Sequence, residues 1–166
     1  MRHKLILVRH AKSSWTEAGI TDFDRPLNDR GLKNAPEMGR RLAKVNFAVD
    51  SIISSPAVRA ITTAKIIAKE IGFDVKRIVQ NEHIYDASVN VLLELVRNLD
   101  EPVNKAMLVG HNPSFTVLCN HLSNAIIDNM PTCSIAQIQF NISSWETVTE
   151  HSGELIDFDY PKKYIS

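Results

Sequence analysis

The chain has 166 residues, a length that suits one globular domain with a sizeable core. Nineteen basic residues balance nineteen acidic ones, so no overall field recruits nucleic acid or an anionic membrane, although a local positive site is compatible with this balance. No apolar stretch approaches the length of a membrane span, and the apolar run after Lys4 is too short for a signal peptide. We therefore expect one soluble, cytoplasmic domain over residues 1–166, with no nucleic-acid or membrane partner.

The two cysteines, Cys119 and Cys133, have neither metal-ligand spacing nor the pattern of a disulfide framework. They also exclude a cysteine-dependent phosphatase, because that chemistry needs an arginine six residues after the cysteine, where Ala125 and Gln139 stand. We expect both thiols to be ordinary core or loop residues.

The first predicted strand is an aliphatic run at residues 5–8, typical of a central parallel strand that is buried on both faces. It ends in Arg9-His10, with Lys12 and Ser13 close behind. Open α/β sheets bind ligands beyond the carboxyl ends of their strands, so this cluster belongs at the mouth of a site. Arg9 offers a bidentate grip on phosphate and His10 a nucleophile at neutral pH, whereas the plain alternative is a polar strand end at the surface.

Residues 14–27 have the composition of a loop, and Asn28 is placed to cap a helix that runs to about Val45, with a kink at Pro36. A second short strand is predicted at 50–53. Ser55 then fits an N-cap and Pro56 a first helical position, so a helix begins there and ends at Gly72.

Arg59 falls in the first turn of this helix, where a cation opposes the helix dipole. That unfavourable placement, at a helix start that itself attracts anions, favours a functional role in binding an anion.

A weak third strand at 77–79 leads to Glu82, and Ser88 caps a helix to about Leu99. The buried strand at 105–109 runs into Gly110-His111-Asn112-Pro113, where Asn112 fits a cap and Pro113 a first helical position. His111 is thus placed between a strand end and a helix start. Arg59 is placed in the same way after the second strand. Because the arrangement occurs twice, it favours a role for His111 in an anion site over a purely structural role in a loop.

The segment from 136 to 142 alternates apolar and polar residues, and 145–150 and 155–160 read as further antiparallel strands. The fold class predicted from the pattern is α/β, with a mostly parallel sheet and an antiparallel C-terminal extension.

Arg9, His10, Arg59 and His111 therefore meet beyond three strand ends. Two arginines neutralise a phosphoryl dianion, while one histidine attacks phosphorus and the other donates hydrogen bonds or a proton. No strong metal-ligand motif accompanies them, so the arginines take the electrostatic role that magnesium often has, and we expect no metal and no cofactor.

The sequence resembles the histidine phosphatase superfamily over nearly its whole length. The motifs that carry the resemblance are Arg9-His10, Ser54-Ser55-Pro56-x-x-Arg59-Ala60 and Val109-Gly110-His111-Asn112-Pro113. Three further segments are closest to the small SixA-type phosphohistidine phosphatases: Arg9-His10-Ala11-Lys12-Ser13, Arg25-Pro26-Leu27-Asn28-x-x-Gly31 and Met130-Pro131-Thr132.

The resemblance implies a three-layer α/β/α, phosphoglycerate mutase-like fold and a phosphatase with a phosphohistidine intermediate on His10. It places Arg9, Arg59 and His111 in the phosphate pocket, and Lys12, Ser13 and Asn112 beside them. Glu82 resembles the acidic proton donor of many members, although a solvated loop glutamate is an equal alternative.

Many members read Arg-His-Gly-Glu at the first motif, whereas this chain has Ala11 and Lys12. A cation at Lys12 argues against a sugar-phosphate mutase, and the short chain leaves little length for a lid, so an open site would admit a side chain of another protein. We expect the substrate to be phosphohistidine on a phosphorylated protein. The alternatives are a small phosphorylated metabolite or another phosphomonoester, and a catalytically silent phosphate-binding module, for which a nucleophile would be unnecessary.

Overall fold

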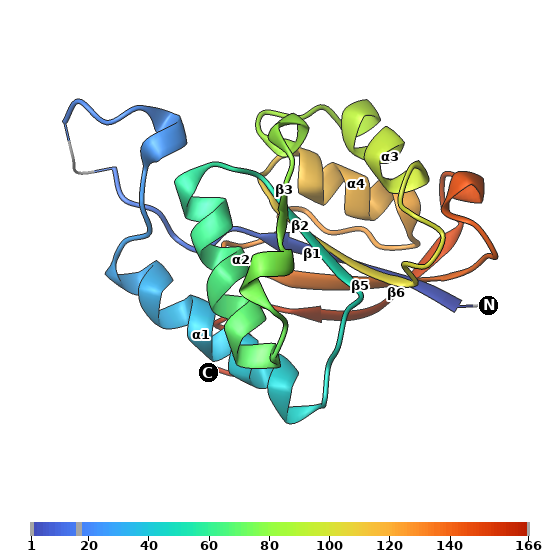
Figure 1. The fold of residues 1–166 in the computed structure, drawn as a ribbon, viewed down its shortest axis with the longest axis horizontal. Helices are drawn as coiled ribbons and strands as arrows, with labels where there is room; N and C mark the ends of the chain where they lie inside the picture. The colour runs from blue at the N-terminus through green and yellow to red at the C-terminus, as the bar shows by residue number, and fades with distance from the viewer. Residues whose placement is uncertain (1, 16–17, 166) are drawn as a thin grey trace.

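The computed structural model describes residues 2–15 and 18–165 as a six-stranded sheet with helices on both faces (Figure 1). The strands, which lie in the order β3-β2-β4-β1-β5-β6, are β1 (Arg2–Arg9), β2 (Ser51–Ser54), β3 (Val79–Gln80), β4 (Lys105–Gly110), β5 (Ile135–Asn141) and β6 (Gly153–Asp159). The α-helices are α1 (Asp29–Lys44), α2 (Val58–Ile71), α3 (Val89–Arg97) and α4 (Ser114–Leu122). Short 3-10 turns are η1 (Asp22–Asp24), η2 (Val75–Arg77), η3 (Glu82–Ile84) and η4 (Trp145–Thr147).

The sheet is parallel from β3 through β2 and β4 to β1, and β5 and β6 extend it with antiparallel pairs. The register pairs Val109 of β4 with both Val8 and Ser54, so the carboxyl ends of β1, β2 and β4 are level. The residues that follow these strands must therefore share one edge of the sheet.

The core has two parts, one on each face of the sheet. Buried residues of α1 and α2, including Met38 and Ile67, pack with Ile6 and Val8 of β1. Leu92 of α3 and Leu118 of α4 pack with Leu5 and Leu7 on the other face. Figure 1 shows α1 and α2 on one side of the sheet and α3 and α4 on the other. The expected three-layer α/β/α architecture is thus confirmed.

Most predicted elements are confirmed. Asn28 caps α1 by accepting from the Gly31 N–H at 2.9 Å, Ser88 caps α3, and Gly72 ends α2 in the left-handed conformation. α1 continues through Pro36 as one helix. Val45, which the apolar spacing placed on the buried face, lies just past the helix end and is 71% exposed.

Several element boundaries differ from the prediction. α2 begins at Val58 rather than after Ser55, and α4 begins at Ser114 because Pro113, after a cis peptide bond, takes the N-cap position. The third strand covers 79–80, since 75–77 form a 3-10 turn.

The predicted strand at 145–150 is wrong, because η4 buries Trp145 against the core and the Trp145 indole donates to the Val103 carbonyl at 2.6 Å. The expected loop at 14–27 contains η1, and residues 16 and 17 within it lie outside the described residues.

Within residues 2–15 and 18–165, no helix has the length and apolar character needed to cross a membrane.

Gly31 brings the start of α1 against the backbone of Lys12, whose carbonyl accepts from the Asn28 N–H at 3.0 Å. A Cβ at residue 31 would stand well inside contact distance of the Lys12 carbonyl oxygen. We expect Gly31→Ala to lower the free energy of unfolding by about 1–3 kcal/mol through overpacking, although alanine is the better helix former. Lys33→Ala, on the exposed side of the same helix, is the control. Denaturant unfolding measures both, and equal stabilities would contradict this contact.

Candidate active site

The level strand ends bring seven predicted site residues to one cavity of about 250 Å³, here called the main cavity. These residues are Arg9, His10, Lys12, Ser13, Arg59, His111 and Asn112. The remaining lining residues are Trp15, Asp22, Arg25 and Thr132. Glu82, the eighth predicted residue, is exposed on η3 and does not line the main cavity.

His10 is presented as a neutral imidazole with a defined tautomer. Its Nδ1 lies 2.7 Å from the Ala11 carbonyl oxygen, and because a carbonyl only accepts, Nδ1 carries the hydrogen. The lone pair is then on Nε2. Burial lowers the pKa of His10 to about 3, opposed by the Ala11 hydrogen bond and reinforced by the positive charges of Arg59 and Arg9. At neutral pH His10 therefore presents an unprotonated ring nitrogen to the cavity, which is the form that a nucleophile needs.

The two predicted arginines are fixed by backbone and side-chain oxygens. Arg9 Nη1 donates to the Met130 carbonyl at 2.7 Å. Arg59, only 6% exposed, donates from Nη1 to the Asp22 carbonyl at 2.6 Å and from Nη2 to the Asp22 carboxylate at 3.0 Å. Two guanidinium groups held in place in this way can stabilise charge on phosphoryl oxygens without reorganising.

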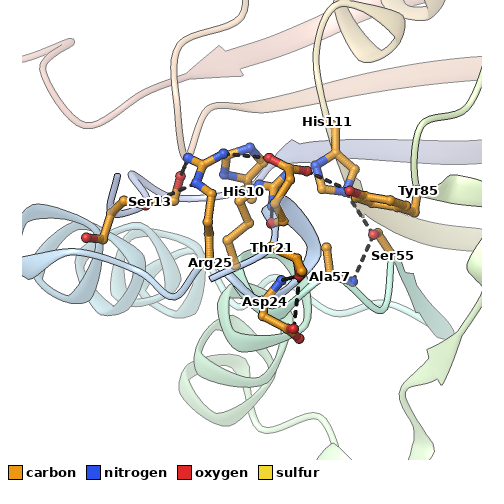
Figure 2. A network of polar contacts seen from close by, with 12 residues as sticks. His10, Ser13, Thr21, Asp24, Arg25, Ser55, Ala57, Tyr85 and His111 are labelled. Atoms are coloured by element: carbon orange, nitrogen blue, oxygen red, sulfur yellow. Dashed lines mark hydrogen bonds and ion pairs between the residues drawn. The ribbon is translucent and has the colours of Figure 1, made fainter. Parts of the chain in front are cut away.

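His111 stands beside His10, with ring centroids 5.2 Å apart. Its Nε2 lies 2.8 Å from the Ser55 hydroxyl, which also accepts from the Ala57 N–H at 3.2 Å (Figure 2). Ser55 therefore orients the second histidine rather than capping α2. Burial lowers the pKa of His111 to about 4, with the charge of Arg59 acting in the same direction.

Asp22 is the central group that the sequence reasoning missed. Its carboxylate accepts from the Tyr85 hydroxyl at 2.6 Å, from Arg25 Nη1 at 2.8 Å and from Arg59 Nη2 at 3.0 Å. These donors, the Tyr85 hydrogen bond first, hold the pKa of Asp22 well below its usual range. Figure 2 shows Arg25 and Tyr85 reaching into this network from opposite sides. Asp22 is therefore an ionised carboxylate at the edge of a cationic cavity.

Arg25, which also lines the main cavity, is 8% exposed and contacts the segment that follows β1. Its Nε donates to the Ser14 carbonyl at 3.0 Å, its Nη2 donates to the Ser13 hydroxyl, and its guanidinium lies over the Trp15 ring. Ser13 thus positions a third arginine. The Arg-Pro motif at 25–26 was the sequence signal available for this residue.

Asn112, which lines the main cavity, links the start of α4 to the segment before β5. Its Nδ2 donates to the Met130 carbonyl at 2.9 Å, and its Oδ1 accepts from the Thr116 hydroxyl at 2.9 Å.

Lys12 also lines the main cavity, and its side chain is exposed to solvent. Among the described residues, no three His, Cys, Asp or Glu side chains are grouped to hold a metal ion.

Comparisons with known proteins identify the family of the chain. The model of the histidine phosphatase superfamily (branch 1) matches residues 5–84. A crystal structure from Agrobacterium tumefaciens, of a protein assigned as the phosphohistidine phosphatase SixA, is 30% identical with a TM-score of 0.81 and covers 96% of this chain and 98% of that one. The chain belongs to the histidine phosphatase superfamily. The resemblance stated from the motifs is thereby confirmed.

Other relatives of this histidine phosphatase superfamily member differ in coverage. The protein histidine phosphatase SixA in complex with tungstate shares the fold, with a TM-score of 0.81 at 19% identity over 95% of this chain and 97% of that one. The mitochondrial serine/threonine-protein phosphatase Pgam5 of Drosophila ananassae is 41% identical over 78 residues, which are 47% of this chain and 26% of that protein.

The tautomer and burial of His10 predict how it titrates. Because its pKa in the folded chain, about 3, lies below the value of about 6.5 for an unfolded histidine, its contribution to stability is present above pH 6.5 and is lost as the pH falls toward 3. We expect the His10 ring resonances to show no titration between pH 8 and pH 5 in NMR spectra, assigned with a His10→Gln variant. A midpoint near 6.5 would contradict the burial argument.

Proposed function

We propose that this chain is a metal-independent phosphatase that takes the phosphoryl group onto His10, and that its substrate is phosphohistidine on another protein. The single observation that carries the proposal is a main cavity with a poised nucleophile and three arginines, in which no acid among the described residues is ready to protonate a leaving group. Asp22, whose pKa is lowered, is ionised, and Glu82 lies outside the cavity.

The proposed reaction has two displacements at phosphorus. His10 Nε2 attacks, the bond between phosphorus and the substrate imidazole breaks, and the departing nitrogen takes a proton from water. Water then attacks the phosphohistidine, which releases inorganic phosphate and restores the lone pair on His10 Nε2. Arg9 and Arg59 stabilise the charge on the equatorial oxygens, so the guanidinium groups supply the electrostatic stabilisation that a metal gives elsewhere.

The leaving group decides between substrates. An alkoxide is very basic, and a positioned acid contributes about 10²–10⁴-fold to its departure. Imidazole is a far better leaving group, because its conjugate acid has a pKa of about 6.5. A cavity whose described residues include no poised acid therefore suits phosphohistidine better than a phosphomonoester. The Agrobacterium protein assigned as a phosphohistidine phosphatase, 30% identical over nearly the whole chain, supports the same substrate class.

The mouth of the main cavity suits a side chain carried by a protein. Trp15 is 75% exposed and Lys12 is also exposed, and both line the cavity. Exposed tryptophan and cationic side chains beside a phosphate site are suited to binding the surface around a phosphorylated residue. We therefore propose a phosphoprotein as the partner.

A phosphomonoester phosphatase is the second candidate, and the match of 41% over 78 residues to Pgam5, a serine/threonine-protein phosphatase, favours it. In that case Glu82 would have to turn from its exposed position toward the leaving oxygen and act as the proton donor. This role for Glu82 stays a prediction.

The two candidates are separated by rates with wild-type protein and Glu82→Gln. We expect EDTA-treated wild type to hydrolyse a phosphohistidine peptide at least 10²-fold faster, in kcat/KM, than phosphoserine and phosphothreonine peptides of the same sequence. Glu82→Gln should leave phosphohistidine hydrolysis within about twofold, because imidazole needs no strong acid.

Comparable rates on the phosphoserine peptide, lost in Glu82→Gln, would support the phosphomonoester candidate instead. Activity that depends on an added divalent cation would contradict the role given to the arginines. Phosphate binding without any turnover would indicate a silent phosphate-binding module.

A further inference from the structure

A second cavity of about 220 Å³, here called the side cavity, adjoins the main cavity. The two share Asp22, Arg59, His111 and Asn112 in their walls. The nucleophile His10 lines only the main cavity. A phosphoryl group within reach of His10 therefore lies in the main cavity, and the side cavity is a place for the group attached to it.

The two cavities differ in charge. Among the described residues, those that line the main cavity carry one carboxylate, Asp22, and four cations: Arg9, Lys12, Arg25 and Arg59. The side cavity is lined, within the part of the chain that the structure describes, by two carboxylates, Asp22 and Asp86, and by one cation, Arg59. A phosphoryl dianion is favoured in the main cavity, whereas a second anion in the side cavity would be repelled.

Asp22 stands at the junction of the two cavities and retains acceptor capacity. Its Oδ2 accepts from both Arg59 and Tyr85, while its Oδ1 accepts from Arg25 alone among the described residues. A carboxylate oxygen accepts about two hydrogen bonds, so Oδ1 can take one more donor. The lowered pKa keeps this oxygen an acceptor at neutral pH.

We propose that Asp22, assisted by Asp86, is a specificity-determining residue that makes the side cavity a subsite for a cationic or N–H-donating group next to the phosphoryl group and excludes a second anion there. The proposal rests on the proposed function and narrows its substrate class. When the ring of a phosphohistidine is protonated, the nitrogen that is not phosphorylated carries an N–H and the ring is a cation, which is the kind of group that this subsite would take. The cavity volume is roughly seven times that of a water molecule in the liquid, which leaves room for a five-membered ring.

Two phosphate esters of similar size and opposite charge test this inference. Phosphoethanolamine carries an ammonium group two carbons from the ester oxygen, and phosphoglycolate carries a carboxylate at the corresponding place. We expect titration calorimetry on wild-type protein at pH 7.5 to give phosphoethanolamine about tenfold tighter binding, a screened value because the Asp22 side chain is 48% exposed. The readout is the ratio of the two dissociation constants, because a change in phosphate affinity that is common to both esters does not alter this ratio.

Asp22→Asn should reduce the ratio to about twofold or less, and Asp86→Asn should reduce it partly. Asparagine suits residue 86, where φ is +56°, so the second variant retains the backbone. Asp24→Asn is the matched control, because Asp24 lies on the same 3-10 turn, is exposed and lines neither cavity.

Equal binding of the two esters to wild type, or a ratio that survives in Asp22→Asn, would overturn the inference. Because the measurement needs no turnover, its outcome is separate from that of the proposed function. A wild type that prefers the cation but does not hydrolyse phosphohistidine would contradict only the proposed function.

Discussion

The site depends on the parallel register of β1, β2 and β4. Val109 pairs with Val8 and with Ser54, which brings the residues after three separate strands to one edge of the sheet. Each chemical group is then the first feature beyond a buried strand: His10 after β1, Ser55 and the start of α2 after β2, and His111 after β4. A slip of one strand would separate His10 from the arginine and histidine side chains that now share the main cavity with it.

Backbone carbonyl groups position several of the side chains at this edge of the sheet. The Ala11 carbonyl fixes the tautomer of His10, the Met130 carbonyl fixes Arg9, and the Asp22 carbonyl fixes Arg59. Carbonyl groups in a folded backbone are already oriented, so the cationic groups are held without long, mobile side chains as partners. Burial also lowers the pKa of His10, which leaves its Nε2 without a proton at neutral pH.

The sequence predicted the groups that stand next to regular elements. Arg9, His10, Arg59 and His111 were found because short apolar strands and helix starts are local patterns, and their carboxyl ends meet by a general rule of α/β sheets. Asp22 and Tyr85 were not found, because the contact that joins them spans 63 residues and depends on how the loop before Pro26 folds back onto the start of α2. No local periodicity encodes such a contact.

The predicted helix start at Ser55 and the predicted strand at 145–150 were wrong because Ser55 and Trp145 each have a tertiary partner. Serine is a common N-cap residue, yet the Ser55 hydroxyl hydrogen-bonds to the His111 ring and accepts from the Ala57 N–H. The helix therefore begins at Val58. Trp145 has the composition of a strand residue, yet its indole is buried against β1, β5 and the Val103 carbonyl. In both cases tertiary contacts decide against the local preference.

The central claim is that His10 Nε2 takes the phosphoryl group. The most direct test mixes wild-type protein with a phosphohistidine peptide labelled on phosphorus, under single-turnover conditions, and stops the reaction in alkali, where phosphohistidine survives. Mass spectrometry of the digested protein should place the label on His10, and a His10→Asn variant should carry none. Phosphate released with no label on His10, or label on a serine or cysteine, would contradict the account.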